Sequence, residues 1–156
     1  MKIAVDVMGT DYGPKELVLG AVNAVKEYGC ETVLVGDEKI IRELLVIYGA
    51  VKNPKITIHH ASEVIAMDEH PAIAVKSKMD ASILVAAGLL RTNECDALVS
   101  SGSTGAAVAS ALFCGGRLEK QYSKVHDVQG KECAGNGKIE KTVRDQLVVP
   151  CRRLTR

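Results

Sequence analysis

Aromatic residues are scarce in this sequence. Its 156 residues include no tryptophan, one phenylalanine and four tyrosines, and the net charge is only +1 at pH 7. Nucleic-acid-binding proteins usually combine a strongly basic surface with aromatic side chains on which bases stack. The scarcity of aromatic residues and the small net charge therefore argue against nucleic-acid binding by the chain as a whole.

Long apolar runs are also missing. No stretch approaches the ~18 consecutive apolar residues of a transmembrane helix. Asp6 stands where a secretory signal peptide would have its apolar region, so we do not expect secretion. Hydrophobic residues make up 47% of the chain and charged residues 25%, which is typical of a soluble globular protein of one domain.

Two common cysteine patterns are absent as well. The cysteines are odd in number and include no C-x-x-C pair, so neither a zinc site nor a disulfide framework is indicated. We interpret them as reduced thiols of a cytoplasmic protein, and we expect no metal and no cofactor. They stand at positions 30, 95, 114, 133 and 151.

The charge is divided unevenly along the chain. Residues 1–116 carry 10 basic and 14 acidic residues, a net charge of −4, whereas residues 117–156 carry 10 and 5, a net charge of +5. The apolar residues of the second segment have no clear periodicity. We therefore expect an α/β domain over residues 1–116, then a basic, weakly structured tail over residues 117–156 with at most a helix around residues 139–147.

Residues 1–116 alternate between strand and helix patterns. Short apolar runs predict buried strands, and apolar residues at helical spacing predict helices, two of which we expect Asp37 and Asp80 to cap. This alternation predicts a parallel sheet with helices on both faces. The strands are expected at residues 3–8, 32–35, 56–59 and 96–99, and the helices at residues 14–28, 38–48, 71–78, 82–91 and 104–113.

Three loops follow carboxyl ends of the predicted strands, where parallel α/β folds bind ligands. They cover residues 8–13, 59–71 and 100–105. The third loop precedes a predicted helix, whose first N–H groups and dipole attract anions, and Ser103 and Thr104 add hydroxyl donors. We predict phosphate or another oxyanion here, the alternative being a simple helix cap. The loop is neither a P-loop nor a G-x-G-x-x-G dinucleotide fingerprint.

The other two loops carry charged side chains. Asp11 either hydrogen-bonds a substrate, orients a neighbouring base or bonds its own backbone in a turn. Histidines and acids in the second loop are potential metal ligands, but no H-E-x-x-H pair is present. His70 with Lys76 and Lys78 can instead place positive charge near an anionic substrate, and the alternative is solvated surface charge.

Segments from these three loops together resemble the PlsX family, the phosphate acyltransferases of bacterial phospholipid synthesis. The resembling segments are residues 1–9, residues 60–71 with 74–76, and residues 99–106, and the likeness spans residues 1 to about 116. It implies a Rossmann-like three-layer α/β/α fold with a mainly parallel sheet, incomplete at its C-terminal end. This is the isocitrate and isopropylmalate dehydrogenase type of fold, which phosphotransacetylases also have.

The resemblance implies transfer of a fatty acyl group from acyl-acyl carrier protein to inorganic phosphate. A membrane glycerol-3-phosphate acyltransferase would then use the acyl phosphate, and the enzyme would be a homodimer in the cytoplasm or loosely at the membrane. For this chemistry the expected phosphate- or substrate-binding residues are Gly9, Gly102, Ser103, Thr104 and Gly105, and the expected catalytic residues are Asp11, His70 and Lys76.

Two residues depart from the family pattern. Thr10 replaces the second glycine of the usual Met-Gly-Gly-Asp, and Ser103 replaces an asparagine, although both keep a hydrogen-bonding side chain. Family members are also longer, so we hypothesise a truncated or frame-shifted homologue that diverges after residue 116. A phosphotransacetylase-like enzyme acting on acyl-coenzyme A, and an inactive or merely anion-binding chain, stay open as alternatives.

Overall fold

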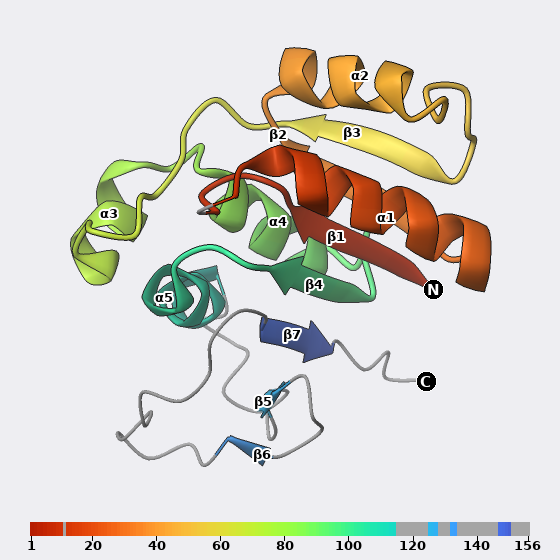
Figure 1. Cartoon of the computed structure of the whole chain (residues 1–156). Helices are drawn as coiled ribbons and strands as arrows, with labels where there is room; N and C mark the ends of the chain where they lie inside the picture. The colour runs from red at the N-terminus through yellow and green to blue at the C-terminus, as the bar shows by residue number, and fades with distance from the viewer. Residues whose placement is uncertain (11, 115–124, 128–131, 134–146, 151–156) are drawn as a thin grey trace.

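The computed structural model describes residues 1–10, 12–114, 125–127, 132–133 and 147–150, and a parallel sheet lies at its centre (Figure 1). Its parallel strands are β1 (Lys2–Asp6), β2 (Glu31–Gly36), β3 (Ile56–His60) and β4 (Ala97–Ser100), in the spatial order β3-β2-β1-β4. The helices between and after them are α1 (Pro14–Tyr28), α2 (Glu38–Ile47), α3 (Pro71–Ser77), α4 (Ser82–Arg91) and α5 (Thr104–Cys114). The predicted α/β class and the predicted elements of residues 1–114 are confirmed.

Side chains alternate between the two faces of the sheet, and each face has its own core. Ala4 and Val33 pack in the cluster that contains α4, whereas Val5 and Leu34 pack in the cluster that contains α1 and α2. All four of these side chains are buried. Strands covered on both faces need nearly continuous apolar sequence, which explains the short apolar runs. The result is the expected arrangement of three layers, helix, sheet and helix (Figure 1).

Three helix ends fall at residues that the sequence marks clearly. α1 begins at Pro14 and ends at Gly29, whose left-handed φ of 66° lets its N–H bond the carbonyl oxygen of Val25 at 3.0 Å. The Asp37 side chain caps α2 by accepting hydrogen bonds of 2.8 and 3.2 Å from two N–H groups of the first turn. The prediction that Asp37 caps this helix is confirmed.

The prediction that Asp80 caps α4 is wrong. The capping position is Ala81, whose side chain makes no capping hydrogen bond. The Asp80 carboxylate instead accepts hydrogen bonds of 2.8 and 2.5 Å from the N–H and hydroxyl of Ser62, while Glu63 pairs with Ala81 in a parallel bridge. The side-chain hydrogen bond from Ser62 is the main cause that lowers the pKa of Asp80 below its usual 3.8. Asp80 therefore fastens the loop after β3 rather than a helix.

The direction of strand order changes between β1 and β4. The chain moves outward from β1 to β2 and β3, then returns to form β4 on the other side of β1. α1 therefore leaves β1 toward one face, and α5 leaves β4 toward the other face, where it packs against α3 and α4. Loops that separate in this way open a crevice at the carboxyl ends of the strands, where such folds bind ligands. These ends point to the left in Figure 1.

Beyond residue 116 the described residues form three short strands, β5 (Val125–Asp127), β6 (Glu132–Cys133) and β7 (Leu147–Pro150). The four strands β1 to β4 are all parallel, as expected, whereas β7 pairs with β4, and β5 pairs with β7 and β6, in antiparallel direction. Most of the helix predicted around residues 139–147 lies outside the described residues, and Leu147 belongs to β7. No helix in the described ranges combines the length and apolar character that a membrane span requires.

Candidate functional site

The three loops that were predicted to hold a ligand meet at the carboxyl ends of β1 and β4. A Cβ atom placed on Gly102 would lie 3.2 Å from the carbonyl oxygen of Gly9, and one placed on Gly105 would lie 2.6 Å from Cγ of Pro71. Glycine permits such close approaches because it has no side chain. The loops after β1, β3 and β4 are thus packed against one another.

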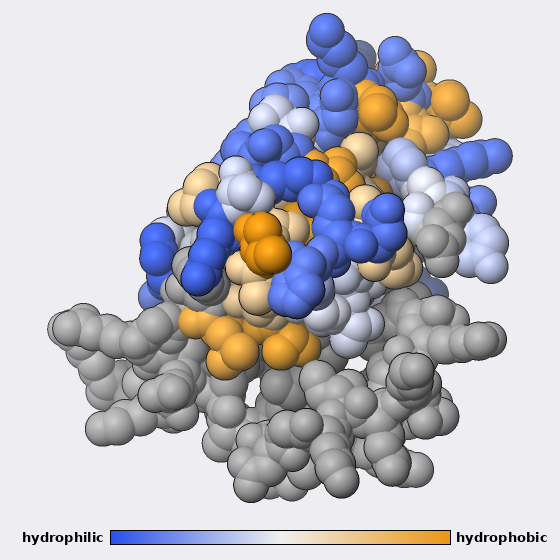
Figure 2. All heavy atoms as spheres, turned by 90° about the vertical axis from the view of Figure 1, so that its left-hand side faces the viewer, coloured by the Kyte–Doolittle hydropathy of each residue, from blue (hydrophilic) through white to orange (hydrophobic). Residues whose placement is uncertain are grey.

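These loops surround a small hollow that is open to solvent. The ends of β1 and β4, the first turns of α4 and α5, and the loop after β3 form its wall. Figure 2 looks onto the side of the molecule where the parallel strands end, and hydrophilic residues cover most of its described surface. The lining side chains that can hydrogen-bond are those of Asp6, Ser82, Ser100 and Ser103.

Asp6 is the last residue of β1 and is only 3% exposed. Its Oδ2 accepts a hydrogen bond of 2.8 Å from the Ser100 hydroxyl at the end of β4, and its Oδ1 accepts one of 3.2 Å from the Met8 N–H. Burial raises the pKa of the Asp6 carboxyl above its usual 3.8. Hydrogen bonds from Ser82, Ser100 and Met8 lower the pKa, but their effect is smaller than that of burial. A buried acid therefore lies at the end of β1, where the direction of the strand order changes.

The start of α5 combines a helix cap with N–H groups that have no partner. The Ser103 hydroxyl accepts a hydrogen bond of 3.3 Å from the Ala106 N–H, as a capping side chain does. In the part of the chain that the structure describes, the N–H groups of Ser103, Thr104 and Gly105 have no hydrogen-bond partner. The two interpretations of this loop are therefore compatible, because one N–H is capped while three others are available to an anion.

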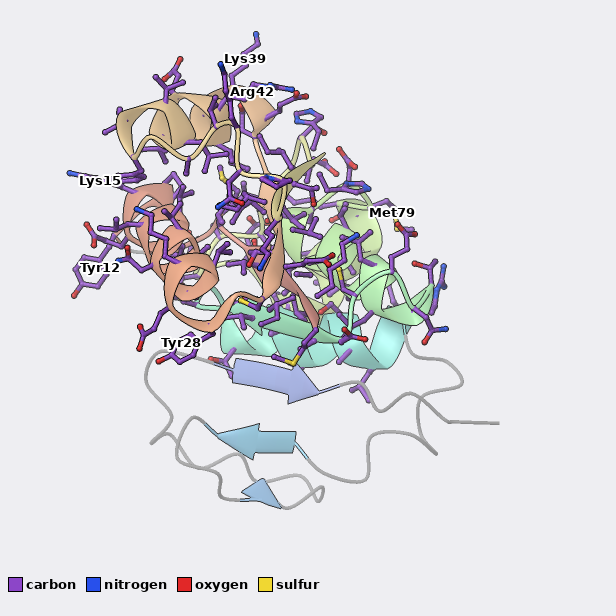
Figure 3. The ribbon with its side chains drawn as sticks, turned by 90° about the vertical axis from the view of Figure 1, so that its right-hand side faces the viewer. Tyr12, Lys15, Tyr28, Lys39, Arg42 and Met79 are labelled. Atoms are coloured by element: carbon purple, nitrogen blue, oxygen red, sulfur yellow. The ribbon has the colours of Figure 1, made fainter. Side chains whose placement is uncertain are left out.

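The loop after β1 forms a tight turn next to the hollow. Gly9 has a φ of +73°, which favours glycine, and the Thr10 hydroxyl donates a hydrogen bond of 2.9 Å to the carbonyl oxygen of Gly13. Asp11 lies outside the described residues, so its catalytic role stays a prediction. The next residue, Tyr12, points away from the rest of the molecule (Figure 3) and is 86% exposed.

His70 and Lys76 are not among the residues that line the hollow. Both are exposed, His70 at the residue before α3 and Lys76 within α3. Lys78 does not line the hollow. Its ammonium donates hydrogen bonds of 2.8 Å to the Val64 carbonyl oxygen and 2.6 Å to Glu69 Oε1. The catalytic roles of His70 and Lys76 stay predictions.

The histidines of the second loop do not gather with acids into a metal site. Within the described ranges there is no group of three or more His, Cys, Asp and Glu residues placed to hold a metal ion. His59 and His60 are exposed, and His60 Nδ1 accepts a hydrogen bond of 3.3 Å from the Glu38 N–H.

The sequence analysis missed the polar residues at the floor of the hollow, namely Asp6, Ser82 and Ser100. One signal was available, because Asp6 is a single acid within an otherwise apolar strand sequence. A strand buried on both faces keeps an acid only where hydrogen bonds or function compensate its burial. Ser82 and Ser100 gave no comparable signal, since serine is common at the ends of strands and helices.

Comparison with known proteins identifies the relatives of the chain. Residues 1–122 match the model of a family described as fatty acid synthesis protein. The chain belongs to this family. Over 119 residues it is 50% identical to a phosphate acyltransferase of Pelotomaculum thermopropionicum, covering 76% of the chain and 34% of that relative. Over 118 residues it is 51% identical to a phosphate acyltransferase of Dictyoglomus turgidum, covering 76% of the chain and 35% of that relative.

The match to the fatty acid synthesis protein family includes the whole candidate site. Asp6, Ser100 and all three converging loops lie within residues 1–122. The chain spans about a third of the length of the curated relatives it matches, and the phosphate acyltransferase of Desulfitobacterium hafniense, 47% identical over 119 residues, gives the same proportion. The similarity ends close to the change of composition after residue 116.

Proposed function

We propose that this chain binds inorganic phosphate at the start of α5 and takes part in transferring a fatty acyl group to it. The observation that supports this most strongly is the set of three N–H groups at the start of α5, of Ser103, Thr104 and Gly105, that have no partner among the described residues, and Ser103 lines the hollow. The positive end of a helix dipole and unpaired N–H groups suit a phosphate. The relatives that share these loops carry the name phosphate acyltransferase.

In this reaction phosphate is itself the nucleophile. A phosphate oxygen attacks the carbonyl carbon of an acyl thioester, a C–O bond forms and the C–S bond breaks. The thiolate that leaves takes up the proton that phosphate gives up, so atoms and charge balance without a covalent enzyme intermediate. The protein then has to align the two reactants and supply donors to the developing oxyanion. In this proposal the α5 N–H groups hold the phosphate in place for the attack.

The acyl donor of the proposed reaction is acyl-acyl carrier protein, and its product is an acyl phosphate for phospholipid synthesis. Such a donor carries an acidic protein, so the exposed His70 before α3 and Lys76 within α3 suit its approach. We place the protein in the cytoplasm or at the membrane surface, where a membrane glycerol-3-phosphate acyltransferase consumes the product. A homodimer is part of the same proposal, and the mass of the protein in solution tests it.

An assay for acyl phosphate separates the possible activities. The chain is incubated with phosphate and either a long-chain acyl-acyl carrier protein or the matching acyl-coenzyme A, and hydroxylamine traps acyl phosphate as the hydroxamate. Product from the carrier protein substrate alone supports the proposal, and product from coenzyme A alone favours a phosphotransacetylase-like enzyme. If the folded chain yields no product from either donor, the proposed transfer is refuted for this chain.

A further inference from the structure

The floor of the hollow carries an acid, which is unexpected in a site for an anion. Asp6 is the one titratable side chain among the described residues that line the hollow, and it is almost completely buried. A carboxylate with little solvent around it repels a bound anion unless a proton lies between them. The bound anion therefore has to be one that can lie next to this carboxylate.

Asp6 keeps the capacity to accept one more hydrogen bond. An ionised carboxylate offers about four lone-pair positions. Its donors in the structure are the Ser100 hydroxyl at 2.8 Å and the Met8 N–H at 3.2 Å, and the nearby Ser82 hydroxyl also lowers its pKa. These leave about one position for a further donor, and a ligand in the hollow can supply it because the carboxyl lines that hollow.

We propose that Asp6 makes the hollow selective for oxyanions that carry a proton, so that it accepts phosphate and rejects sulfate. This inference rests on the proposed function, since it takes phosphate binding at α5 as given. Near neutral pH phosphate keeps at least one proton, so its hydroxyl donates to Asp6 while its other oxygens accept from the α5 N–H groups. Sulfate carries no proton, and its oxygens face the carboxylate with like charge.

Among the described residues that line the hollow, no charged side chain other than Asp6 is present. From the loop after β3, the hollow is lined by Val64 and Ile65, and the ammonium of Lys78 on the Val64 carbonyl is already paired with Glu69. The residues that α4, β4 and α5 contribute to the lining are serines, glycine and apolar residues, none of which titrates. Discrimination between the two anions should therefore follow the ionisation of Asp6.

Calorimetric titration of the full chain with phosphate, arsenate and sulfate at pH 7.5 tests the proposal. Arsenate carries a proton as phosphate does, so both should bind at least about tenfold more tightly than sulfate. This factor corresponds to the free energy of one hydrogen bond to a charged group. In Asp6→Asn the amide can donate to any oxyanion, so the ratio should fall to near one. The control Asp37→Asn removes the same charge at the start of α2, where asparagine still caps, and should keep the ratio.

The outcomes separate the inference from the function on which it rests. Equal binding of phosphate and sulfate by the unaltered chain overturns the selectivity and leaves the phosphate site intact. Binding of neither anion refutes the proposed function itself. If Asp6→Asn does not fold, the titrations of the unaltered chain still decide, because arsenate that binds no more tightly than sulfate overturns the proposal.

Discussion

At the scale of single residues, Asp6 connects two loops that are far apart in the sequence. Its Oδ1 holds the Met8 N–H, and its Oδ2 holds the Ser100 hydroxyl, whose oxygen in turn accepts a hydrogen bond of 3.4 Å from the Gly102 N–H. One buried carboxylate thus fixes the start of both loops that border the crevice. Its cost is the burial of a charge, which these hydrogen bonds offset only in part.

This burial gives stability a specific dependence on pH. The folded-state pKa of Asp6 is raised, so its contribution to stability is fully present below the unfolded value of 3.8 and is lost as the pH rises through the folded value. The free energy of unfolding of the wild type relative to Asp6→Asn should therefore increase as the pH falls from 7 toward 4. Urea unfolding of both proteins across this range measures it, and a difference that stays constant or decreases would contradict the assignment.

Ser103 provides a second test at the residue scale. Ser103→Ala removes the acceptor of the Ala106 N–H and should lower the free energy of unfolding by about 1 kcal/mol, the usual value of an N-cap. Ser103→Asn keeps a capping side chain and should stay within a few tenths of a kcal/mol of the wild type. Urea unfolding of the three proteins checks the order, and an alanine variant as stable as the asparagine variant would show that the cap contributes nothing.

At the scale of elements, the contact between the starts of α3 and α5 shapes the rim of the hollow. A Cβ atom on Gly105 would lie 2.6 Å from the Pro71 ring, which cannot rotate away. Gly105→Ala should therefore push the two helices apart and cost about 1–3 kcal/mol of stability. Gly88→Ala in α4 is the matched control, because nothing lies within 4 Å of its Cβ, and alanine there should stabilise the helix by up to about 1 kcal/mol.

Thermal melts and phosphate titrations of the two glycine variants check this prediction. We expect Gly105→Ala to lower both the melting temperature and the phosphate affinity, and Gly88→Ala to lower neither. Equal behaviour of the two variants would mean that α3 and α5 do not need this close approach.

Element boundaries could be predicted where the local sequence decides them. Pro14 and Gly29 set the ends of α1, and Asp37 caps α2, because proline, glycine and aspartate act within one turn of their own position. Asp80 was predicted wrongly because a residue 18 positions earlier, Ser62, competes for its carboxylate. A cap prediction from sequence assumes that no such distant donor exists.

At the scale of the whole molecule, the meeting of the loops could be predicted but the floor of the hollow could not. Any parallel α/β sheet brings the carboxyl ends of its strands to one edge, so the loops of residues 8–13, 59–71 and 100–105 were expected to converge. The pairing of Asp6 with Ser100 depends instead on β4 lying beside β1. That adjacency follows from the strand order β3-β2-β1-β4, which periodicity does not reveal.

The change of composition after residue 116 leads to a prediction about the gene. The family match ends at residue 122, and the net charge changes from −4 to +5 across residue 116. If a frame-shift causes this change, one of the other two reading frames downstream of codon 116 should encode a continuation similar to the relatives. Sequencing the gene region checks it, and two frames without such similarity would refute the frame-shift.

The central claim is that the N–H groups of Ser103, Thr104 and Gly105 bind phosphate. An NMR titration of the ¹⁵N-labelled chain with inorganic phosphate observes each of these amides separately. We expect saturable shifts at these three amides and none at Lys39 and Ile40, whose N–H groups at the start of α2 are already bonded to Asp37. Equal shifts at both helix starts, or no saturable shift near residue 104, would contradict it.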